Sequence, residues 1–557
     1  MIALWLACAA PDVPNQGPVS VYFNNPGSNL DTVWESDAVR LMIDLIDQAD
    51  ASVDMAVMGF SHEPLVDAVI RAYDRGVPVR MVGDGGHIHN AGYTALYDRD
   101  VPLRVGNSAH IMHDKFVVVD GRFVFTGTAN WTDSDLQQNA NNFVFLDSPP
   151  VAADFTAEFE QMWNGAYGQD KITLDNGRTY PVGDASVEVW FSPNEDAMGR
   201  ILELVDGAKT SVRFAIFAFT KDQLGSAFVR QHEALGGSVA EGTGVAGVMD
   251  QSQMHSNGQF TEVYRLLRSE VPLRLDGNDA TTQPGDYQAG GGRLHAKTII
   301  LDAEGEEPIL ITGSFNWSAS ATQSNDETLL VVHDREAARL ATAWWESLWF
   351  NGRVPGDQPD APEVLAGDVV INEVHWYGVT PEDPEGFDEF IELKNMTDRD
   401  LVLDLWQVSS PFDTVVGFPP GTVLPAGDTL LVADHVLEAY QDGAPQDATS
   451  ALTTADLVIN PFNDDRGLRL YLEDHALELS LLDPQANVID VAGDGGPPFA
   501  GGPDGNAARS MERIDPSAPG DDPANWASCP LTSGEGSIRE DWRNLILATP
   551  DTDNASL

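Results

Sequence analysis

Two matched segments of this sequence carry the residue types needed for chemistry on a phosphate. The first, HDKFVVVD, runs from His113 to Asp120 and is followed by GTANW from Gly127. The second, HAKTIILD, runs from His295 to Asp302 and is followed by GSFNW from Gly313. One histidine two residues before a lysine would mean little, but two copies with matching aspartates and trailers do not arise by chance. The repeat predicts one chemical task shared by both segments.

The side chains of each copy can face a single site, because residues i and i+2 of a β-strand point the same way. The apolar and β-branched residues after each lysine suit a buried strand. Two lysines, two amides and two hydroxyls around two imidazoles would suit one tetrahedral anion, and a phosphate diester fits best. The predicted phosphate-binding residues are Lys115, Thr128, Asn130, Lys297, Ser314 and Asn316.

The two imidazoles can divide the work of breaking a phosphodiester, since one can attack phosphorus while the other protonates the leaving group. Histidine suits both tasks because its unperturbed pKa is near neutrality. The pair must start in opposite protonation states, so a bell-shaped pH–rate curve is expected. The lysines supply the positive charge, and the sequence therefore predicts no metal and no cofactor.

The two segments resemble the HKD motifs of the phospholipase D superfamily, and the likeness covers residues 18–350. The resemblance implies that one histidine forms a covalent phosphohistidine, while the other is general acid and then general base for water. By family analogy His113 is the usual nucleophile. The resemblance carries catalytic assignments to the motif residues, with a more structural than chemical role for the two aspartates: His113, Lys115, Asp120, Asn130, His295, Lys297, Asp302 and Asn316.

The chain departs from the family pattern at one position. Aligning Thr132 with Ser318 places Asn141 opposite Glu327, where the family usually has an acidic residue close to the histidine. Glu327 is therefore expected to act as a catalytic partner of His295. Asn141 is neutral and would stabilise an imidazolium less well, or it merely caps a turn. The charge argument makes His295 the more basic histidine, so the choice of nucleophile stays open, and reduced activity is an alternative.

An internal duplication extends beyond the motifs and predicts the architecture. Strands at 52–58 and 212–217 alternate with amphipathic helices at 36–49, 64–75 and 197–205, which is an α/β pattern. Two similar lobes, residues 18–180 and 181–350, are expected around a pseudo-twofold axis. Only their meeting would assemble a complete site, so the pocket should lie at the lobe interface.

The remaining sequence has a different character. Residues 351–367 are rich in Pro, Gly and Asp and read as a linker. Short strand candidates follow at 369–374, 389–393, 401–405, 429–432 and 468–472, which favours a β-sandwich. Ile371-Asn-Glu, Phe390-Ile-Glu-Leu-Lys-Asn and Ser510-Met-Glu-Arg-Ile-Asp resemble the lamin-tail domain, an immunoglobulin-like sandwich, over residues 368–527. The resemblance implies a binding or spacing module whose partner is unknown, and residues 528–557 are expected to be a C-terminal tail.

The first residues resemble a bacterial lipoprotein signal. An apolar run ends in Leu-Ala-Cys8 and is followed by a Pro-, Asn- and Gly-containing tether, so residues 1–17 are assigned to a signal-like segment in which Cys8 would be lipidated. The segment is short and lacks Lys and Arg, which a mis-assigned start codon could explain. Export to the cell envelope or medium is expected, with peripheral membrane contact through Cys8 or the substrate, and the chain is expected to be a monomer.

The charge of the chain bears on its substrate. With 87 acidic and 31 basic residues, the net charge is -56, yet Lys115 and Lys297 are two of only six lysines. Binding to nucleic acid draws on Lys and Arg contacts to phosphates, and no basic cluster is visible. The charge favours hydrolysis of a phospholipid head-group phosphodiester, with a zwitterionic or cationic head group. The lamin-tail resemblance instead favours an extracellular nuclease of the same superfamily. A catalytically weak surface-binding protein is a third alternative, supported by Asn141 alone.

Overall fold

The structure is a computed structural model of the 557-residue chain. It describes residues 17–24, 37–106, 110–238, 242–257, 261–276, 292–355, 364–377, 389–412, 415–418, 422–434, 455–459, 470–484, 487–505, 507–531, 546–549 and 554. The chain divides into two compact units. Of the described residues, those from 17 to 254, 266–276 and 292–354 belong to the first unit, and 255–257, 261–265, 355 and those from 364 onward belong to the second.

The first lobe is built on a seven-stranded sheet with the order β1-β7-β6-β5-β2-β3-β4. Its strands are β1 (Val19–Asn24), β2 (Val53–Val57), β3 (Val79–Gly83), β4 (Leu103–Val105), β5 (Lys115–Val119), β6 (Phe123–Gly127) and β7 (Asn141–Asp147). Its helices are α1 (Asp37–Asp47), α2 (Glu63–Asp74), α3 (Ala91–Asp98) and α4 (Pro149–Trp163). The strand that begins with the first motif lysine, β5, lies in the middle of this sheet.

The second lobe repeats this sheet, with the order β12-β11-β10-β13-β14-β15-β9-β8. Its strands are β8 (Arg178–Val182), β9 (Ala185–Ser192), β10 (Ser211–Ile216), β11 (Gly244–Met249), β12 (Leu273–Leu275), β13 (Lys297–Leu301), β14 (Ile309–Gly313) and β15 (Glu327–His333). The helices in this stretch are α5 (Ala197–Asp206), α6 (Asp222–Leu235), α7 (Gln251–Asn257), α8 (Val263–Arg268), α9 (Ala319–Gln323) and α10 (Arg335–Asn351). Read from the edge strands β4 and β12, the first seven strands of the two orders correspond one to one, and β8 is an additional edge strand of the second sheet. This correspondence confirms the predicted pair of α/β lobes.

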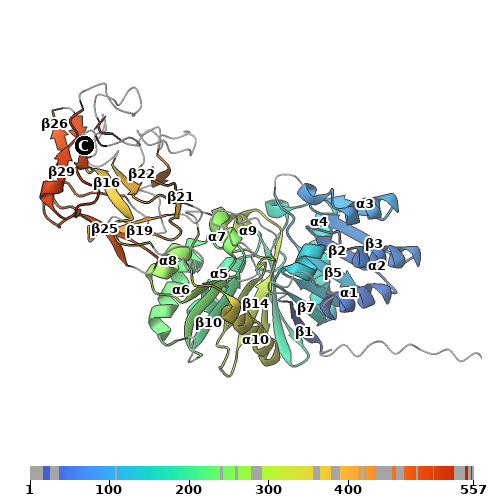
Figure 1. Cartoon of the computed structure of the whole chain (residues 1–557). Helices are drawn as coiled ribbons and strands as arrows, with labels where there is room; N and C mark the ends of the chain where they lie inside the picture. Colours follow the sequence, from blue (N-terminus) through green and yellow to red (C-terminus); the bar gives the residue numbers. More distant parts are fainter. Residues whose placement is uncertain are drawn as a thin grey trace, which may run out of the picture. The chain divides into compact units, whose positions relative to one another are not determined.

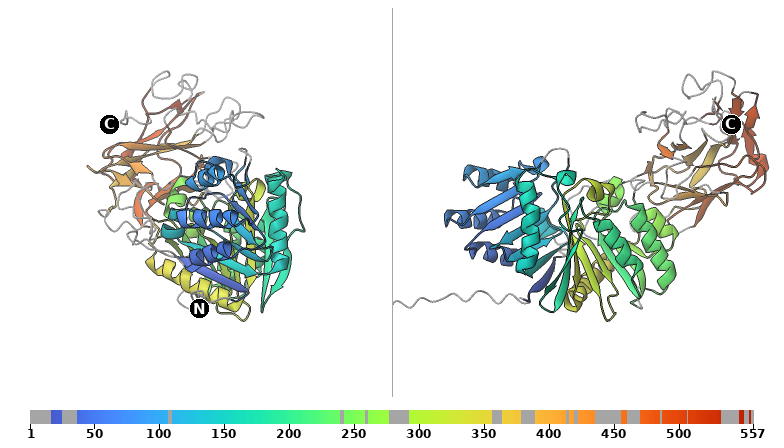
Figure 2. Two further views of the ribbon diagram at one scale, coloured as in Figure 1. Left: turned by 90° about the vertical axis from the view of Figure 1, so that its right-hand side faces the viewer. Right: turned by 180° about the vertical axis from the view of Figure 1, so that it is seen from behind.

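The layers of the first unit follow from amphipathic patterning. Helices α1, α2 and α3 bury their apolar sides on one face of the first sheet, and they lie on its outer side in Figure 1. The other face of that sheet, the facing side of the second sheet and the buried sides of α4 and α10 share one core, in which Phe116, Phe155, Ile300 and Trp345 are buried. The view from behind shows the two sheets next to each other (Figure 2). The shared core therefore holds the two lobes as one body.

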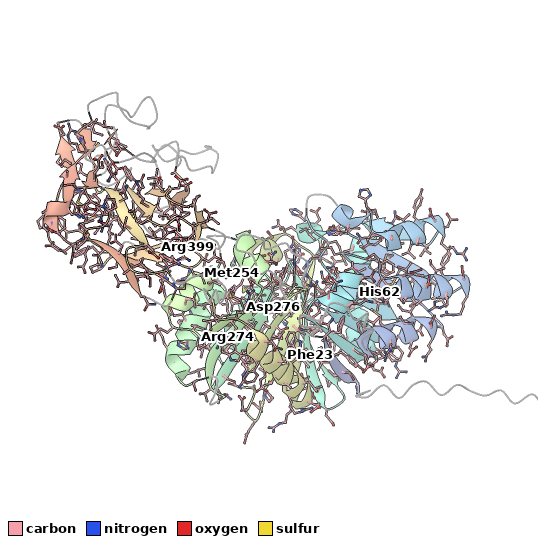
Figure 3. All side chains as sticks on the ribbon, viewed as in Figure 1. Phe23, His62, Met254, Arg274, Asp276 and Arg399 are labelled. Atoms are coloured by element: carbon pink, nitrogen blue, oxygen red, sulfur yellow. The ribbon has the colours of Figure 1, made fainter. Side chains whose placement is uncertain are left out.

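An aromatic contact ties the outer strand of lobe 1 to the last helix of lobe 2. The Phe23 ring on β1 stacks on the Trp344 ring of α10 with centroids 5.1 Å apart, and Phe23 can be followed in Figure 3. The indole N–H of Trp344 donates to the carbonyl of Asn24 at 3.0 Å. An aromatic pair of this kind contributes about 0.5–1.5 kcal/mol beyond the area that it covers. The contact helps to fix the lobe interface on which the site depends.

The second unit contains an all-β sandwich. One sheet has the order β23-β22-β17-β16-β28-β29, a second has β20-β19-β24-β25, and smaller sheets pair β18 with β21 and order β26-β27-β30. Its strands are β16 (Val369–His375), β17 (Phe390–Asn395), β18 (Leu401–Val402), β19 (Gln407–Ser409), β20 (Val415–Gly417), β21 (Val423–Leu424), β22 (Thr429–Asp434), β23 (Leu457–Ile459), β24 (Glu478–Leu482), β25 (Val488–Gly493), β26 (Gly502–Asp504), β27 (Ala507–Arg509), β28 (Met511–Arg513), β29 (Trp526–Ser528) and β30 (Ile546–Leu547). The predicted fold class is confirmed here as well.

Two predictions about this unit need correction. The sandwich does not end at residue 527, because β30 pairs with β27 and the Asn554 amide donates to the carbonyls of Asn372 and Arg513 at 3.1 and 2.9 Å. The predicted tail therefore supplies part of the fold. The predicted strand 468–472 is wrong over its described part, because residues 470–472 lie outside any strand, although Leu470 and Leu472 are buried.

Several predictions fall on residues outside the described ranges. They are Cys8 with its flanking signal-like segment and the central part of the predicted linker, residues 356–363. Among the described helices, none combines the length and the apolar character that crossing a bilayer requires.

Candidate active site

Each motif histidine lies where the two lobes pair through their backbones. The N–H of His113 in lobe 1 donates to the carbonyl of Asp326 in lobe 2 at 2.9 Å. The N–H of His295 in lobe 2 donates to the carbonyl of Ala140 in lobe 1 at 2.9 Å. Isolated parallel bridges flank both contacts. The exchange brings the two histidines into one place, as the duplication predicts.

His113 pairs with a carboxylate of the opposite lobe. Its Nδ1 lies 2.6 Å from Oε2 of Glu327, and both side chains are buried. Glu327 was expected to serve His295 of its own lobe, and that prediction is wrong. The reason is geometric, because Glu327 opens strand β15 beside Asp326, whose backbone carries His113.

His295 has a different environment. Its Nδ1 lies 3.2 Å from Oδ1 of Asn141 and 3.4 Å from Oδ1 of Asp135, both in lobe 1. The Phe217 ring packs against the imidazole with centroids 4.6 Å apart. Asn141 is therefore a direct partner of His295 and does not merely cap a turn.

The two motif lysines are held inside the site. The Nζ of Lys115 donates to the carbonyl of His113 at 2.5 Å, and that of Lys297 donates to the carbonyl of His295 at 2.5 Å. Burial lowers the pKa of Lys115 to about 8. Burial, with Lys115 as the next contribution, lowers the pKa of Lys297 to about 7. Two cations that are this poorly hydrated favour an anion between them.

Burial is also the main cause that holds the pKa of both histidines well below its ordinary value, and both lysines add to it. In the empty site, burial and the lysines therefore disfavour protonation of each imidazole. Burial raises the pKa of Glu327 to about 7, although Lys115 and the Ser314 hydroxyl oppose it. A bound phosphate would reverse the effect of the lysines, because its negative charge favours an imidazolium.

The predicted phosphate-binding role of Thr128 and Ser314 is not what the structure shows. The Thr128 hydroxyl donates to Oδ1 of Asn141 at 2.7 Å and accepts from the backbone N–H of Asn142. The Ser314 hydroxyl donates to Oε2 of Glu327 at 2.7 Å and accepts from the backbone N–H of Thr328. Both residues are fully buried. They orient the partners of the histidines. Each hydroxyl already donates its proton within the fold, so neither hydroxyl is left to donate to a ligand.

Asn130 and Asn316 remain suited to ligand binding. Asn130 is 8% exposed and Asn316 is half-buried, and the Oδ1 atom of each has no hydrogen-bond partner among the described residues. The Nδ2–H groups of these amides are the ones that would donate to phosphate oxygens. The turns that present them require glycine at Gly127 and Gly313, where φ is 147° and 135°. A Cβ there would lie 2.3 and 2.2 Å from backbone carbonyl oxygens of the neighbouring strands.

The motif aspartates lie at the other end of their strands. Oδ1 of Asp120 accepts from the N–H groups of Ala51 and Ser52 at 2.7 and 3.0 Å. Oδ1 of Asp302 accepts from those of Lys209 and Thr210 at 2.8 and 2.7 Å. At roughly 3.3 Å per strand residue, each carboxylate is well separated from its histidine. Both anchor the start of the neighbouring strand.

Replacing Asp120 or Asp302 by alanine is therefore expected to lower stability rather than to remove a reacting group. The loss of charge-assisted backbone hydrogen bonds should reduce the free energy of unfolding by roughly 1–3 kcal/mol. Urea denaturation of both variants measures it. A somewhat larger loss is expected for Asp302→Ala, because Oδ1 of Asp302 also accepts from the Thr210 hydroxyl at 3.0 Å. A fall in the kcat of fully folded protein would contradict this assignment.

Two further carboxylates position the motifs, and the motifs alone do not reveal them. Oδ2 of Asp84 accepts from the N–H of Met112 at 3.0 Å, and Oδ2 of Asp250 accepts from that of Leu294 at 3.1 Å. Each aspartate directly follows a strand and fixes the backbone one residue before a catalytic histidine. Their matched position in the internal repeat is the signal that could have found them. Among the described residues, no group of three or more His, Cys, Asp or Glu side chains could hold a metal ion.

Comparison with known proteins matches both parts of the chain. The family model "Cardiolipin synthase, PLD-like domain" matches residues 42–163 and 201–349, and the Lamin Tail Domain model matches residues 364–496. Mitochondrial cardiolipin hydrolase of Drosophila melanogaster is 31% identical over 147 residues, which cover 22% of this chain and 58% of the relative. The Xenopus tropicalis protein of the same name is 35% identical over 126 residues, 22% of this chain and 60% of the relative. The chain thus spans somewhat more than half the length of these curated relatives.

The chain is also similar to solved structures. Nuc, a phospholipase D family member from Salmonella typhimurium, is 28% identical and covers 26% of this chain and 93% of its own, with a TM-score of 0.23. Phosphatidylserine synthase of Haemophilus influenzae is 11% identical and covers 62% and 89%, with a TM-score of 0.44. The paired lobes with two H-x-K motifs define a phospholipase D-like protein. The chain is a member of the phospholipase D superfamily that carries a lamin-tail domain.

Proposed function

We propose that this chain hydrolyses the head-group phosphodiester of a phospholipid through a covalent phosphohistidine, without a metal ion. The observation that carries the proposal is the exchange of partners between the lobes, which sets two buried histidines and two buried lysines in one site. His113 is the nucleophile in this proposal, and His295 is the general acid and base.

The proton positions follow from the contacts of the imidazoles. With Nδ1–H of His113 donating to Glu327, the lone pair on Nε2 is free to attack phosphorus. The bond to the head-group oxygen breaks as His295 donates its proton to that oxygen. His295 then takes a proton from water, and the resulting hydroxide displaces His113 from phosphorus. The products are phosphatidic acid and the free head-group alcohol, and both histidines return to their starting states.

Lys115, Lys297, Asn130 and Asn316 would stabilise the phosphoryl oxygens during both transfers. Charge that builds on these oxygens meets donors that are already in place in a buried site, where such interactions are strongest. The low pKa values of the lysines make the empty site weakly charged, so an anionic diester restores the charge of the lysines when it binds.

Two observations support a phospholipid over a nucleic acid. The curated relatives from Drosophila melanogaster and Xenopus tropicalis are named as mitochondrial cardiolipin hydrolases. The net charge of -56 opposes the approach of a polyanion at low salt. Export and lipid attachment at Cys8 belong to the same proposal, since they would place the enzyme beside its substrate.

The affinity for a diester is expected to fall as the pH rises from 6 to 9. A phosphodiester keeps one negative charge over this range, whereas Lys297 and then Lys115 lose their charges near pH 7 and 8. One lost charge-assisted contact corresponds to about 1.5–3 kcal/mol, so KM should rise roughly tenfold or more. The KM for bis(p-nitrophenyl) phosphate measures it. Lys297→Arg, whose charge persists at all these pH values, should flatten the rise, and an equal rise in both proteins would contradict the role of Lys297.

The proposed function is tested by offering vesicles of phosphatidylcholine, vesicles of cardiolipin and linear DNA side by side, in EDTA, with His113→Ala and His295→Ala as controls. Release of head group or phosphatidyl product that both substitutions abolish would support the proposal. DNA cleavage alone would move the chain to the nucleases. A need for added metal would contradict the mechanism, and the absence of any histidine-dependent turnover would contradict the activity.

A further inference from the structure

We propose that Asp135 is the positioning carboxylate of His295 and replaces the acidic residue that is absent at Asn141. Each histidine then has one carboxylate from the opposite lobe, Glu327 for His113 and Asp135 for His295. This inference rests on the proposed function, because it concerns how His295 gains and loses its proton.

Asp135 lies in a short π-helical turn, Ser134–Gln138, directly after the first motif trailer. Its residue is 3% exposed, and Oδ1 lies 3.4 Å from Nδ1 of His295. The carboxylate is held from two sides. The Asn139 amide donates to Oδ1 at 2.6 Å, and the backbone N–H of Asn130 donates to Oδ2 at 2.9 Å. Its orientation toward His295 is thus fixed by groups that are themselves part of the site.

Lobe 2 reaches the same arrangement from a different sequence position. The segments 132–141 and 318–327 align without a gap, so Asp135 matches Ala321 and Asn141 matches Glu327. In lobe 2 the amide of Asn325 donates to Oε1 of Glu327 at 3.2 Å. In lobe 1 the matching amide of Asn139 donates to Asp135. In both lobes the matching amide donates to the carboxylate that faces the histidine. In lobe 1 this carboxylate comes from Asp135, six positions before Asn141, the residue that aligns with Glu327.

Asn141 occupies the position at which lobe 2 carries Glu327, and its side chain is uncharged. Its Oδ1 accepts from the Thr128 hydroxyl and lies 3.2 Å from Nδ1 of His295. Its Nδ2 donates to the backbone carbonyl of Asp135 at 3.0 Å. These contacts fix which way the amide points, so it orients the imidazole without adding charge. The negative charge that an imidazolium needs comes from Asp135.

The electrostatics agree with this geometry. Burial works to raise the pKa of Asp135, but His295 and the donors from Asn139 and Asn130 outweigh it and hold that pKa below its ordinary value. For His295, the charge of Asp135 is the largest influence that opposes burial. Lys297 and Lys115 act on both histidines. Asp84 and Asp135 both favour protonation of His113, which Glu327 contacts directly. Asp135 therefore stays ionised and favours the protonated form of His295, as the acid step requires.

The test replaces Asp135 by asparagine and moves the carboxylate back in the double variant D135N/N141D. Two readouts are taken on the full chain: the alkaline limb of the pH dependence of kcat/KM, and the pKa of His295 from NMR of histidine labelled with ¹⁵N. Asp135→Asn should lower the alkaline limb and the His295 pKa by about one unit. The double variant should bring both back toward the wild-type values. Asp133→Asn, an exposed neighbour, should move neither.

Unchanged values in folded Asp135→Asn would overturn the proposal, as would a double variant that folds but leaves the His295 pKa low. If Asp135→Asn does not fold, the double variant alone tests the proposal. The proposal then requires the alkaline limb of kcat/KM in the double variant to lie at the wild-type pH. The NMR readout does not depend on turnover. A wild-type chain that is inactive on every diester, but whose His295 pKa still responds to Asp135, would contradict the proposed function and not this pairing.

Discussion

His113→Ala is expected to lower kcat by about 10⁴-fold or more, the scale on which loss of a nucleophile acts. The proposed reaction has no second group that could form the bond to phosphorus, and the lysines and amides alone can only bind and polarise the diester. His295→Ala should have an effect of similar size on a lipid substrate, whose alcohol leaving group needs a proton. Steady-state hydrolysis of vesicles, with thermal unfolding to confirm the fold, measures both.

A matched control is available in the same lobe. His89 is exposed and takes part in none of the contacts described for the site, so His89→Ala should retain wild-type kcat. The kcat of Glu327→Gln should lie between those of His113→Ala and His89→Ala, since this substitution keeps the hydrogen bond to His113 and removes only the charge. Activity of His113→Ala within tenfold of the wild-type value would be incompatible with a nucleophilic role for that residue.

Lys171→Met is expected to reduce the free energy of unfolding by about 3–5 kcal/mol, because it leaves buried carboxylates without their cation. Lys171 is buried, pairs with Glu158, and holds Oδ1 of Asp326 at 2.8 Å. Asp114, the residue between His113 and Lys115, is another buried carboxylate of the same cluster. It interacts with Lys171 and adds to the negative charge that this lysine offsets. Lys209→Met removes an exposed lysine and should change stability by less than about 0.5 kcal/mol.

The effect of Lys171→Met should depend on pH. Burial raises the pKa of Glu158 to about 7 and that of Asp114 to about 6, even with Lys171 present. A carboxylate whose folded pKa is raised destabilises the fold as the pH rises through that value, because the unfolded chain releases the proton more readily. The loss of unfolding free energy caused by Lys171→Met should therefore be smaller at pH 5 than at pH 8. A loss that is the same at both pH values would show that packing, and not charge, is responsible.

The lobes and their motifs could be predicted from sequence because both are local or repeated. Strand periodicity, the duplication and the H-x-K spacing are visible without any contact information, and the matched strand orders around β5 and β13 confirm them. The lamin-tail sandwich was predictable for the same reason. Its true end was not, because Asn554 reaches Asn372 across a long sequence separation that no pattern marks.

The partners of the histidines could not be predicted, because they depend on how the lobes exchange strand ends. Sequence alignment assigns Glu327 to His295 of its own lobe. The backbone bridge at Asp326 instead brings the Glu327 carboxylate next to His113 of the opposite lobe. The hydroxyls of Thr128 and Ser314 match the family pattern, yet they are used up inside the fold. Asp135 has no counterpart in lobe 2, so the repeat gave no reason to choose it.

The central claim, one covalent site formed by the histidines of both lobes, is tested most directly by trapping the intermediate in His295→Ala. A ³²P-labelled diester with a p-nitrophenol leaving group needs no general acid to form the bond to His113, whereas the hydrolysis of that bond needs His295. The proposed mechanism predicts a burst of about one p-nitrophenol per chain and acid-labile ³²P on the peptide that contains His113. Turnover without a burst, or label on a residue other than His113, would contradict it.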